Sequence, residues 1–230
     1  MPKNLTLLGG ERVNISLKRR LLAFDSRAAI GIGSLIIFIA MIVVAGIAAS
    51  VFIQTMNSLE QQAIETGQNV IRDISSGLKV THVSGYSDGT DITQLAIFLT
   101  TTSGSGGIDL TYAYISLSDT TSQVILSYGS GNFSSSVSNG LFGTLNASNL
   151  TSTAYGIMVI RDADSSCSST APTINNDDLV VLLVNTSKCF SGIDTRTEVF
   201  GNVIPEQGIS GTIGFTTPSN YIDTIIDLQP

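Results

Sequence analysis

The feature that most constrains this chain is an uninterrupted apolar run near its N-terminus. Residues 29–53, AIGIGSLIIFIAMIVVAGIAASVFI, are nearly all apolar or small, and no charged residue occurs from Ala28 to Leu59. As an α-helix these 25 residues extend roughly 37 Å, enough to span a hydrocarbon core of about 30 Å with some tilt. An ordinary strand is much shorter than this run. The run therefore predicts a helix that enters a membrane at some stage.

Charge is distributed unevenly on the two sides of this run. Residues 1–28 contain six Lys or Arg and two Asp or Glu, a net charge of +4, whereas the other 202 residues contain five basic and 16 acidic side chains, a net charge of −11. A basic segment before an apolar helix stays on the cytoplasmic side, so the acidic remainder is predicted to be exported. The acidic body also argues against nucleic acid as a partner, because phosphate binding requires clustered Lys and Arg.

The helical pattern continues beyond the apolar run. Ala63, Val70 and Ile74 follow at heptad-like steps, and the first strong stop signal is Gly77, a predicted C-cap. A helix over residues 29–76 would be roughly 70 Å long. Glycines and alanines recur within its apolar part, which favours close approach of one helix to another. A secretory signal fits poorly because the run is too long, while a plain single-span anchor remains an alternative.

From Lys79 onward the pattern changes to short alternating segments separated by Ser, Gly, Asn and Thr clusters. The predicted strands are 93–99, 110–117, 123–126, 156–160, 178–184, 197–200 and 211–215. About seven short strands with turn signals between them indicate an antiparallel, Ig-like β-sandwich. The predicted fold class is therefore α+β: a long hydrophobic helix followed by this sandwich.

The N-terminal residues resemble a known family. Residues 27–41 (RAAIGIGSLIIFIAM) are similar to the processing site and helix start of the archaellins (archaeal flagellins), in the type IV pilin-like superfamily, and residues 203–218 resemble the C-terminal strands of that family. The resemblance implies three parts: a leader over 1–28, a filament-core helix over 29–78 and an outer domain over 79–230. It also implies a cut between Ala28 and Ala29 by a prepilin-peptidase-like protease, which makes Gly31 the third mature residue.

Two departures from the family pattern concern this cut. The leader is long, and Ala28 stands where the family usually has Gly. The competing cut after Lys18-Arg19-Arg20 would leave Asp25 and Arg27 ahead of the apolar helix, where burying charge is costly.

The resemblance also implies a function and its partners. The chain would be a structural subunit of the archaeal motility filament, extracellular on the cell surface, with a precursor in the cytoplasmic membrane. It would assemble with copies of itself and related archaellins, aided by an ATP-driven membrane platform. The residues expected to pack in the filament core are Gly33, Ile36, Ile39, Val43, Gly46 and Ile53. The alternatives are an archaeal adhesive type IV pilin and a membrane-anchored extracellular β-sandwich binding protein.

The outer domain carries three further groups of candidate residues. Asn-x-Ser/Thr sequons at Asn132, Asn146, Asn149 and Asn185 predict N-glycosylation, which is common in archaellins. Cys167 and Cys189 are the two cysteines, and export would permit a disulfide that closes a loop of about 20 residues. Asp162, Asp164, Asp177 and Asp178 are hard oxygen donors suited to Ca²⁺ or Mg²⁺, although a solvated acidic loop is the simpler interpretation and we expect no cofactor.

No catalytic motif is evident. His82 is the single histidine, and nothing in the sequence places a nucleophile beside it. No nucleophile elbow, zinc-protease or phosphate-loop motif occurs. We therefore expect no enzymatic activity.

Overall fold

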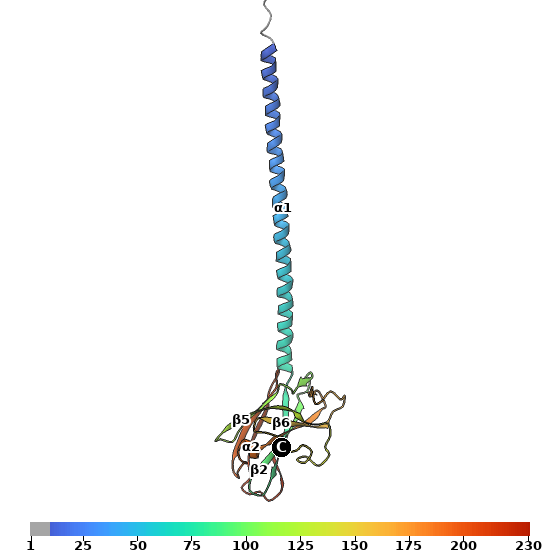
Figure 1. Ribbon diagram of the computed structural model, residues 1–230, viewed down its shortest axis with the longest axis vertical. Coiled ribbons are helices and arrows are strands. Elements are labelled where there is room, and N and C mark those ends of the chain that lie inside the picture. Colours follow the sequence, from blue (N-terminus) through green and yellow to red (C-terminus); the bar gives the residue numbers. More distant parts are fainter. Residues whose placement is uncertain (1–9) are drawn as a thin grey trace, which may run out of the picture. The chain divides into compact units, whose positions relative to one another are not determined.

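A computed structural model describes the backbone of residues 10–230 and the side chains of residues 30–230. The chain divides into two compact units, Met1–Glu65 and Thr66–Pro230. Helix α1 (Gly10–Ser75) accounts for the described part of the first unit and supplies the first residues of the second, which also contains all the strands (Figure 1).

Helix α1 begins earlier than predicted, because the backbone of residues 10–28 of the expected leader is also helical. The helix ends at Ser75, one residue before its predicted end. Gly77 is not the predicted left-handed cap, since its φ lies outside the positive region. Its backbone forms a parallel bridge with Ile209, and a Cβ there would lie 2.9 Å from the Thr102 hydroxyl. Glycine is needed at this position for close packing where the helix meets the β domain.

Eleven strands and one short helix follow α1. They are β1 (Leu78–Ser87), β2 (Ile92–Thr101), β3 (Ile108–Asp109), β4 (Tyr114–Ser118), β5 (Gln123–Ser134), β6 (Ala154–Arg161), β7 (Thr173–Ile174), β8 (Leu179–Asn185), α2 (Thr186–Cys189), β9 (Glu198–Ile204), β10 (Gly211–Thr216) and β11 (Ile225–Gln229).

The predicted class, a long helix followed by a mostly antiparallel β domain, is confirmed, but the arrangement of the strands differs from an Ig-like sandwich. Nine strands form one sheet in the order β10-β9-β4-β5-β6-β8-β2-β1-β11, and β3 pairs with β7 separately. The sheet curls on itself: β9 and β10, at one end of the sheet, contact β1, which lies near the opposite end. Strands β5 and β6 are parallel. The long segment between them, residues 135–153, gives the chain room to return in the same direction.

The core lies inside the curled sheet. Alternate residues of β2, β4, β8 and β10 point inward, among them Ile97, Ile115, Leu182 and Ile213, and all are essentially inaccessible to solvent. A second apolar cluster lies on the opposite face of β2, β8 and β6, where Phe142, Leu145 and Leu150 of the segment 135–153 cover the sheet. These three strands are therefore buried on both faces, which explains the continuous apolar run of β8.

Candidate functional site

The apolar part of α1 is the candidate assembly site. From Ile30 onward this helix is long and apolar enough to cross a membrane, and none of its most apolar stretch is buried within the chain. Of the residues predicted for the filament core, Ile36, Ile39, Val43 and Ile53 are all exposed, as is Gly46, while Gly33 is partly buried. Because so much contiguous apolar surface is unstable in water, this helix requires a cover of lipid or of other protein.

A shallow groove on α1 shows how such a cover would fit. Ala40, Ala45 and Ala48 line it, and larger side chains border it, namely Ile37, Met41 and Val44. These residues recur at helical spacing, so they share one face of the helix. Small residues between larger ones let a second helix approach closely. The recurrence of glycines and alanines in the sequence predicted this close approach, although the six residues named for core packing include none of those that line the groove.

The predicted processing residues are only partly described. Ala28 and Ala29 lie in the helical backbone of α1, but their side chains are outside the described residues. Gly31 is in the described part and is exposed, with open space where a Cβ would be. The proposed cut therefore stays a prediction.

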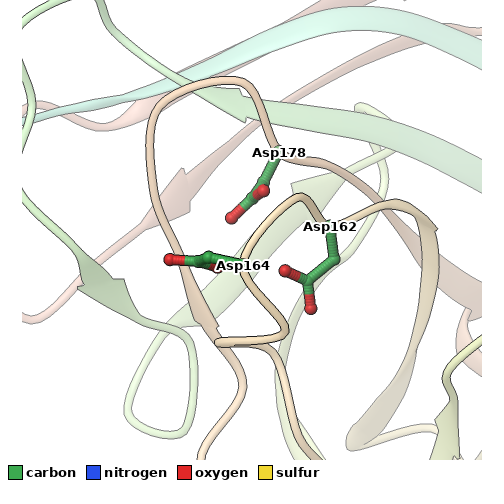
Figure 2. A group of neighbouring side chains, drawn as sticks. All are labelled: Asp162, Asp164 and Asp178. Carbon is green, nitrogen blue, oxygen red and sulfur yellow. The ribbon is translucent and has the colours of Figure 1, made fainter.

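The acidic residues singled out from the sequence are brought together only in part. Carboxylate oxygens of Asp162, Asp164 and Asp178 all lie within 4.8 Å of one another, on the loops that follow β6 and precede β8 (Figure 2). Asp177 is not in this group. Its backbone has a positive φ of 74°, and its carbonyl accepts a hydrogen bond from Arg161. Its inclusion as a candidate ligand is therefore corrected.

Backbone N–H groups donate hydrogen bonds to many of the carboxylate oxygens in this acidic group. Asp178 is fully buried and accepts hydrogen bonds from the backbone N–H groups of Ala163 and Asn175. Hydrogen bonds, chiefly from Ser166, lower the pKa of Asp164, so this carboxyl stays ionised. Among the described residues, no Lys, Arg or His forms an ion pair with any of the three carboxylates. A buried carboxylate without a cationic partner is unusual.

The predicted disulfide is contradicted, since Cys167 and Cys189 are free thiols. The backbone N–H of Cys167 donates a hydrogen bond to Asp162, which directly follows β6. The last residue of β6 pairs with the first residue of β8, so Cys167 lies near the start of β8. Cys189 ends α2, which follows the last residue of β8. The strand between these two places spans roughly 20 Å, much more than the roughly 7 Å that a disulfide allows between Cα atoms. Burial raises the pKa of Cys167 to about 12 and that of Cys189 to about 11, so both thiols stay protonated.

The four sequons fall into two classes. Asn146 and Asn149 are exposed, in the segment that covers the outer face of β2, β8 and β6. Asn132 and Asn185 are only 8% and 7% exposed. Their amide nitrogens donate hydrogen bonds to the carbonyls of Asn149 and Ala147, and the side chain of Asn185 also caps α2. These two side chains hold loops together, and their burial disfavours attachment of a glycan, so we expect glycans at Asn146 and Asn149 instead.

A pair of acidic side chains gives the β domain a defined pH dependence. Desolvation first, and then the neighbouring Asp194, raise the pKa of Asp91 above its ordinary value. A raised pKa in the folded state gives stability that is present at low pH and lost as the pH rises through that pKa. We therefore expect Asp194→Asn to raise the melting temperature of the full chain in detergent at pH 7. The gain should shrink as the pH falls through the raised pKa of Asp91, because Asp91 then loses the charge that Asp194 opposes. Equal effects above and below that pKa would contradict this account.

A long, exposed apolar helix joined to a β domain is an architecture suited to a subunit that associates through its helix. The family model described as archaeal-type flagellin matches residues 28–215. Flagellin B2 of Methanocaldococcus jannaschii is 42% identical over 207 residues, covering 88% of this chain and 95% of that protein. Flagellin B4 of Pyrococcus abyssi is 39% identical over 217 residues, covering 88% and 99%.

Solved structures agree. The crystal structure of the archaeal flagellin FlaB1 from Methanocaldococcus jannaschii matches with a TM-score of 0.60 and 35% identity, covering 67% of this chain and 97% of that one. A chain of the archaeal flagellum of Methanospirillum hungatei strain JF1 shares the fold, with a TM-score of 0.61 at 16% identity over 87% of this chain and 99% of that one. The chain belongs to the archaeal-type flagellin family. It is a structural subunit of the extracellular archaeal motility filament and assembles with other archaellins.

Proposed function

We propose that this subunit is made as a membrane precursor and enters the filament by transfer of its helix. The apolar helix would hold the precursor in the cytoplasmic membrane, with the basic leader, residues 1–28, on the cytoplasmic side, until a prepilin-peptidase-like protease cuts between Ala28 and Ala29. An ATP-driven membrane platform would then move the helix from lipid into a bundle of identical helices. The apolar surface thereby passes from one dry environment to another without entering water.

The exposed apolar surface of α1 is the observation that carries this proposal. Its isoleucines, valines, leucines and phenylalanines are mostly more than half exposed. Burying each such side chain is worth about 1.5–3 kcal/mol relative to leaving it in water. Lipid removes this cost for the precursor, but lipid alone does not require the groove of small residues between Ile37 and Ala48. Packing of one copy against another would bury the exposed apolar side chains and would also fill the groove of small residues.

The direct test is to shear cells and examine the released material. We expect electron microscopy to show polymers of this chain and N-terminal sequencing of those polymers to begin at Ala29. A start at Leu21 would overturn the cleavage assignment. Uncut monomers that remain in the membrane fraction would overturn the whole proposal and favour the membrane-anchored binding protein. Gene deletion that abolishes surface attachment while leaving swimming intact would favour the adhesive pilin.

The role that we propose is structural, and the surroundings of the single histidine are consistent with it. His82 Nε2 lies 2.8 Å from Ser84 Oγ and 3.2 Å from Asp227 Oδ1. Both partners meet the same ring nitrogen, so the three side chains do not form a nucleophile–base–carboxylate relay. The His82 ring instead packs at a tilt against Phe98, with ring centroids 5.3 Å apart.

Glycosylation should follow the exposure of the sequons. We expect Asn146→Gln and Asn149→Gln each to remove one glycan mass from the purified filament protein, measured by intact mass. Asn132→Gln and Asn185→Gln are the matched variants at buried sequons, and they should leave the glycan mass unchanged. Each of these should lower stability by about 1–3 kcal/mol, because a buried hydrogen bond is lost. A glycan at Asn132 or Asn185, or none at Asn146 and Asn149, would contradict this assignment.

We further propose that Ca²⁺ or Mg²⁺ binds the group formed by Asp162, Asp164 and Asp178. The support is a buried carboxylate, Asp178, beside two others without an ion pair among the described residues. A metal concentration of 100 times Kd stabilises a folded protein by about 2.7 kcal/mol. Exchanging EDTA for calcium should therefore raise the melting temperature of the chain by roughly 5–10 °C.

A matched pair of variants tests this metal proposal. Asp164→Asn should abolish the calcium effect, since it removes one carboxylate of the group. Asp119→Asn removes a partly exposed carboxylate that only holds its own turn, through the backbone N–H groups of Thr121 and Ser122, and it should preserve the effect. A melting temperature independent of calcium and EDTA would show that the group is a solvated loop.

A further inference from the structure

The two halves of the curled sheet differ on their outer surface. The half formed by β2, β8 and β6 is covered by the segment 135–153, which carries the exposed sequons Asn146 and Asn149. In the part of the chain that the structure describes, no comparable apolar cluster covers the other half, formed by β5, β4, β9 and β10. Among the described residues, the chain therefore covers only part of its own outer surface.

We call the outer surface of β5, β4, β9 and β10 the uncharged sheet face. Strand pairing places its residues in rows, because registered partners in antiparallel strands point to the same side. Ser116 lies between Ile125 and Asn202, and Ser118 is paired with Phe200. The outward residues are Tyr114, Ser116, Ser118, Gln123, Ile125, Ser127, Glu198, Phe200, Asn202, Ile204, Thr212, Gly214 and Thr216. Within these four described strands, Glu198 at one corner is the only charged outward residue.

Large apolar side chains on this face are accessible. Ile125 is 61% exposed, Phe200 51% and Tyr114 40%. Small polar side chains separate them, chiefly serines and threonines, so almost no charge has to be desolvated when the face is covered. Apolar and aromatic anchors within a polar surround are typical of protein–protein contacts.

The distribution of charge indicates which partner the uncharged sheet face contacts. After residue 28 the chain carries a net charge of −11, so two copies repel each other wherever their acidic surfaces meet. A face almost without charge is where two identical acidic domains can touch at the lowest electrostatic cost. The same face contains none of the four sequons on its outward positions, whereas the covered half carries the exposed ones.

We propose that the uncharged sheet face contacts the outer domain of a second copy of this chain in the filament. This inference rests on the proposed function, because it requires copies held side by side by their helices. Four strands about 4.8 Å apart and about five residues long present roughly 300 Å². That is well below the roughly 800 Å² per partner of an independent interface. The contact therefore stabilises a filament in which the helices supply a high effective concentration, and it does not dimerise free subunits.

A charge placed on this face tests the contact. Ile125→Glu should lower the temperature at which purified filaments dissociate by about 5 °C or more, because each contact would acquire a desolvated charge. Val137→Glu is the matched control, since Val137 is an exposed aliphatic residue in the segment over the other half of the sheet. It should leave the dissociation temperature unchanged. Equal dissociation temperatures for the two variants would overturn the inference while leaving helix-driven assembly intact.

Cysteine labelling identifies the occupant directly. In filaments, Ile125→Cys should react with a maleimide polymer at least about tenfold more slowly than Val137→Cys. In subunits dissolved in detergent the two rates should be similar. Peptide mapping distinguishes the new cysteines from Cys167 and Cys189. Equal rates in filaments would overturn the inference, and equal protection in detergent would assign the cover to the chain's own helix. Absence of filaments from the unmodified chain would instead refute the proposed function.

Discussion

Ile39→Asp should eliminate filaments while leaving the precursor in the membrane. Ile39 lies in the exposed apolar segment of α1, and the bundle of helices would surround it with other apolar side chains. A carboxylate in the middle of a membrane helix costs about 3 kcal/mol on insertion scales, which a run this apolar tolerates. The same charge in a dry bundle recurs in every subunit. At about 1.4 kcal/mol per factor of ten, a cost of this size reduces assembly by at least roughly a hundredfold.

The measurement combines two readouts on the same cells. The yield of sheared filaments, by pelleting and electron microscopy, should collapse, and swimming should stop. The amount of subunit in the membrane fraction, by immunoblot, should stay close to that of the unmodified chain. Asn69→Asp is the matched control, because it adds the same charge to the same helix beyond the apolar run. Normal filaments from Ile39→Asp would show that the helix is not in the core of the polymer.

The second large effect is expected in the β domain, where Leu182→Ala should lower the melting temperature by about 10 °C. Leu182 is fully buried in β8, an interior strand of the sheet, and pairs with Ile157 of β6 on one side and Ile97 of β2 on the other. Truncating a buried leucine costs about 2–5 kcal/mol, since neighbouring side chains refill the cavity only in part. For a unit of this size each kcal/mol corresponds to roughly 2–4 °C.

Thermal unfolding of the full chain in detergent measures this effect. Val137→Ala is the control, since Val137 is exposed and its truncation leaves no cavity. It should change the melting temperature by no more than about 1 °C. A similar loss for both variants would mean that β8 is not the centre of the cooperative unit.

Sequence patterns predicted the elements that bury a face or a stripe. The apolar run predicted α1, and its end at Ser75 lies within one residue of the expected position. Strands β2, β6 and β8 were predicted because they are rich in Val, Ile and Leu, as strands buried on both faces must be.

Elements with weaker patterns were missed. Strand β1 contains Gly85 and several polar residues, and it becomes a strand through pairing with β2 and β11. Strand β11 is short and forms the end of the sheet, so few of its residues are buried. Pairing partners that are far apart in the sequence supply the free energy in both cases, and no local pattern records them.

Among the candidate residues, the sequence identified types and the structure decided their use. Every sequon has the same local pattern, yet two of the four asparagines are buried and hold loops together. The two cysteines are only 22 positions apart, but β8 separates them. Three of the four aspartates converge only because the ends of β6 and β8 are adjacent in the sheet.

The sequence by itself determined that one end of this chain avoids water and that the remainder forms a β domain, because hydropathy and periodicity are local properties. It also determined the family, through the residues around the start of the apolar run. Tertiary structure alone decided which asparagines face solvent, which thiols are separated, and which half of the sheet has no cover. Those outcomes depend on contacts between segments that are distant in the sequence. Such contacts, and not the identity of any single residue, decide which side chains are buried.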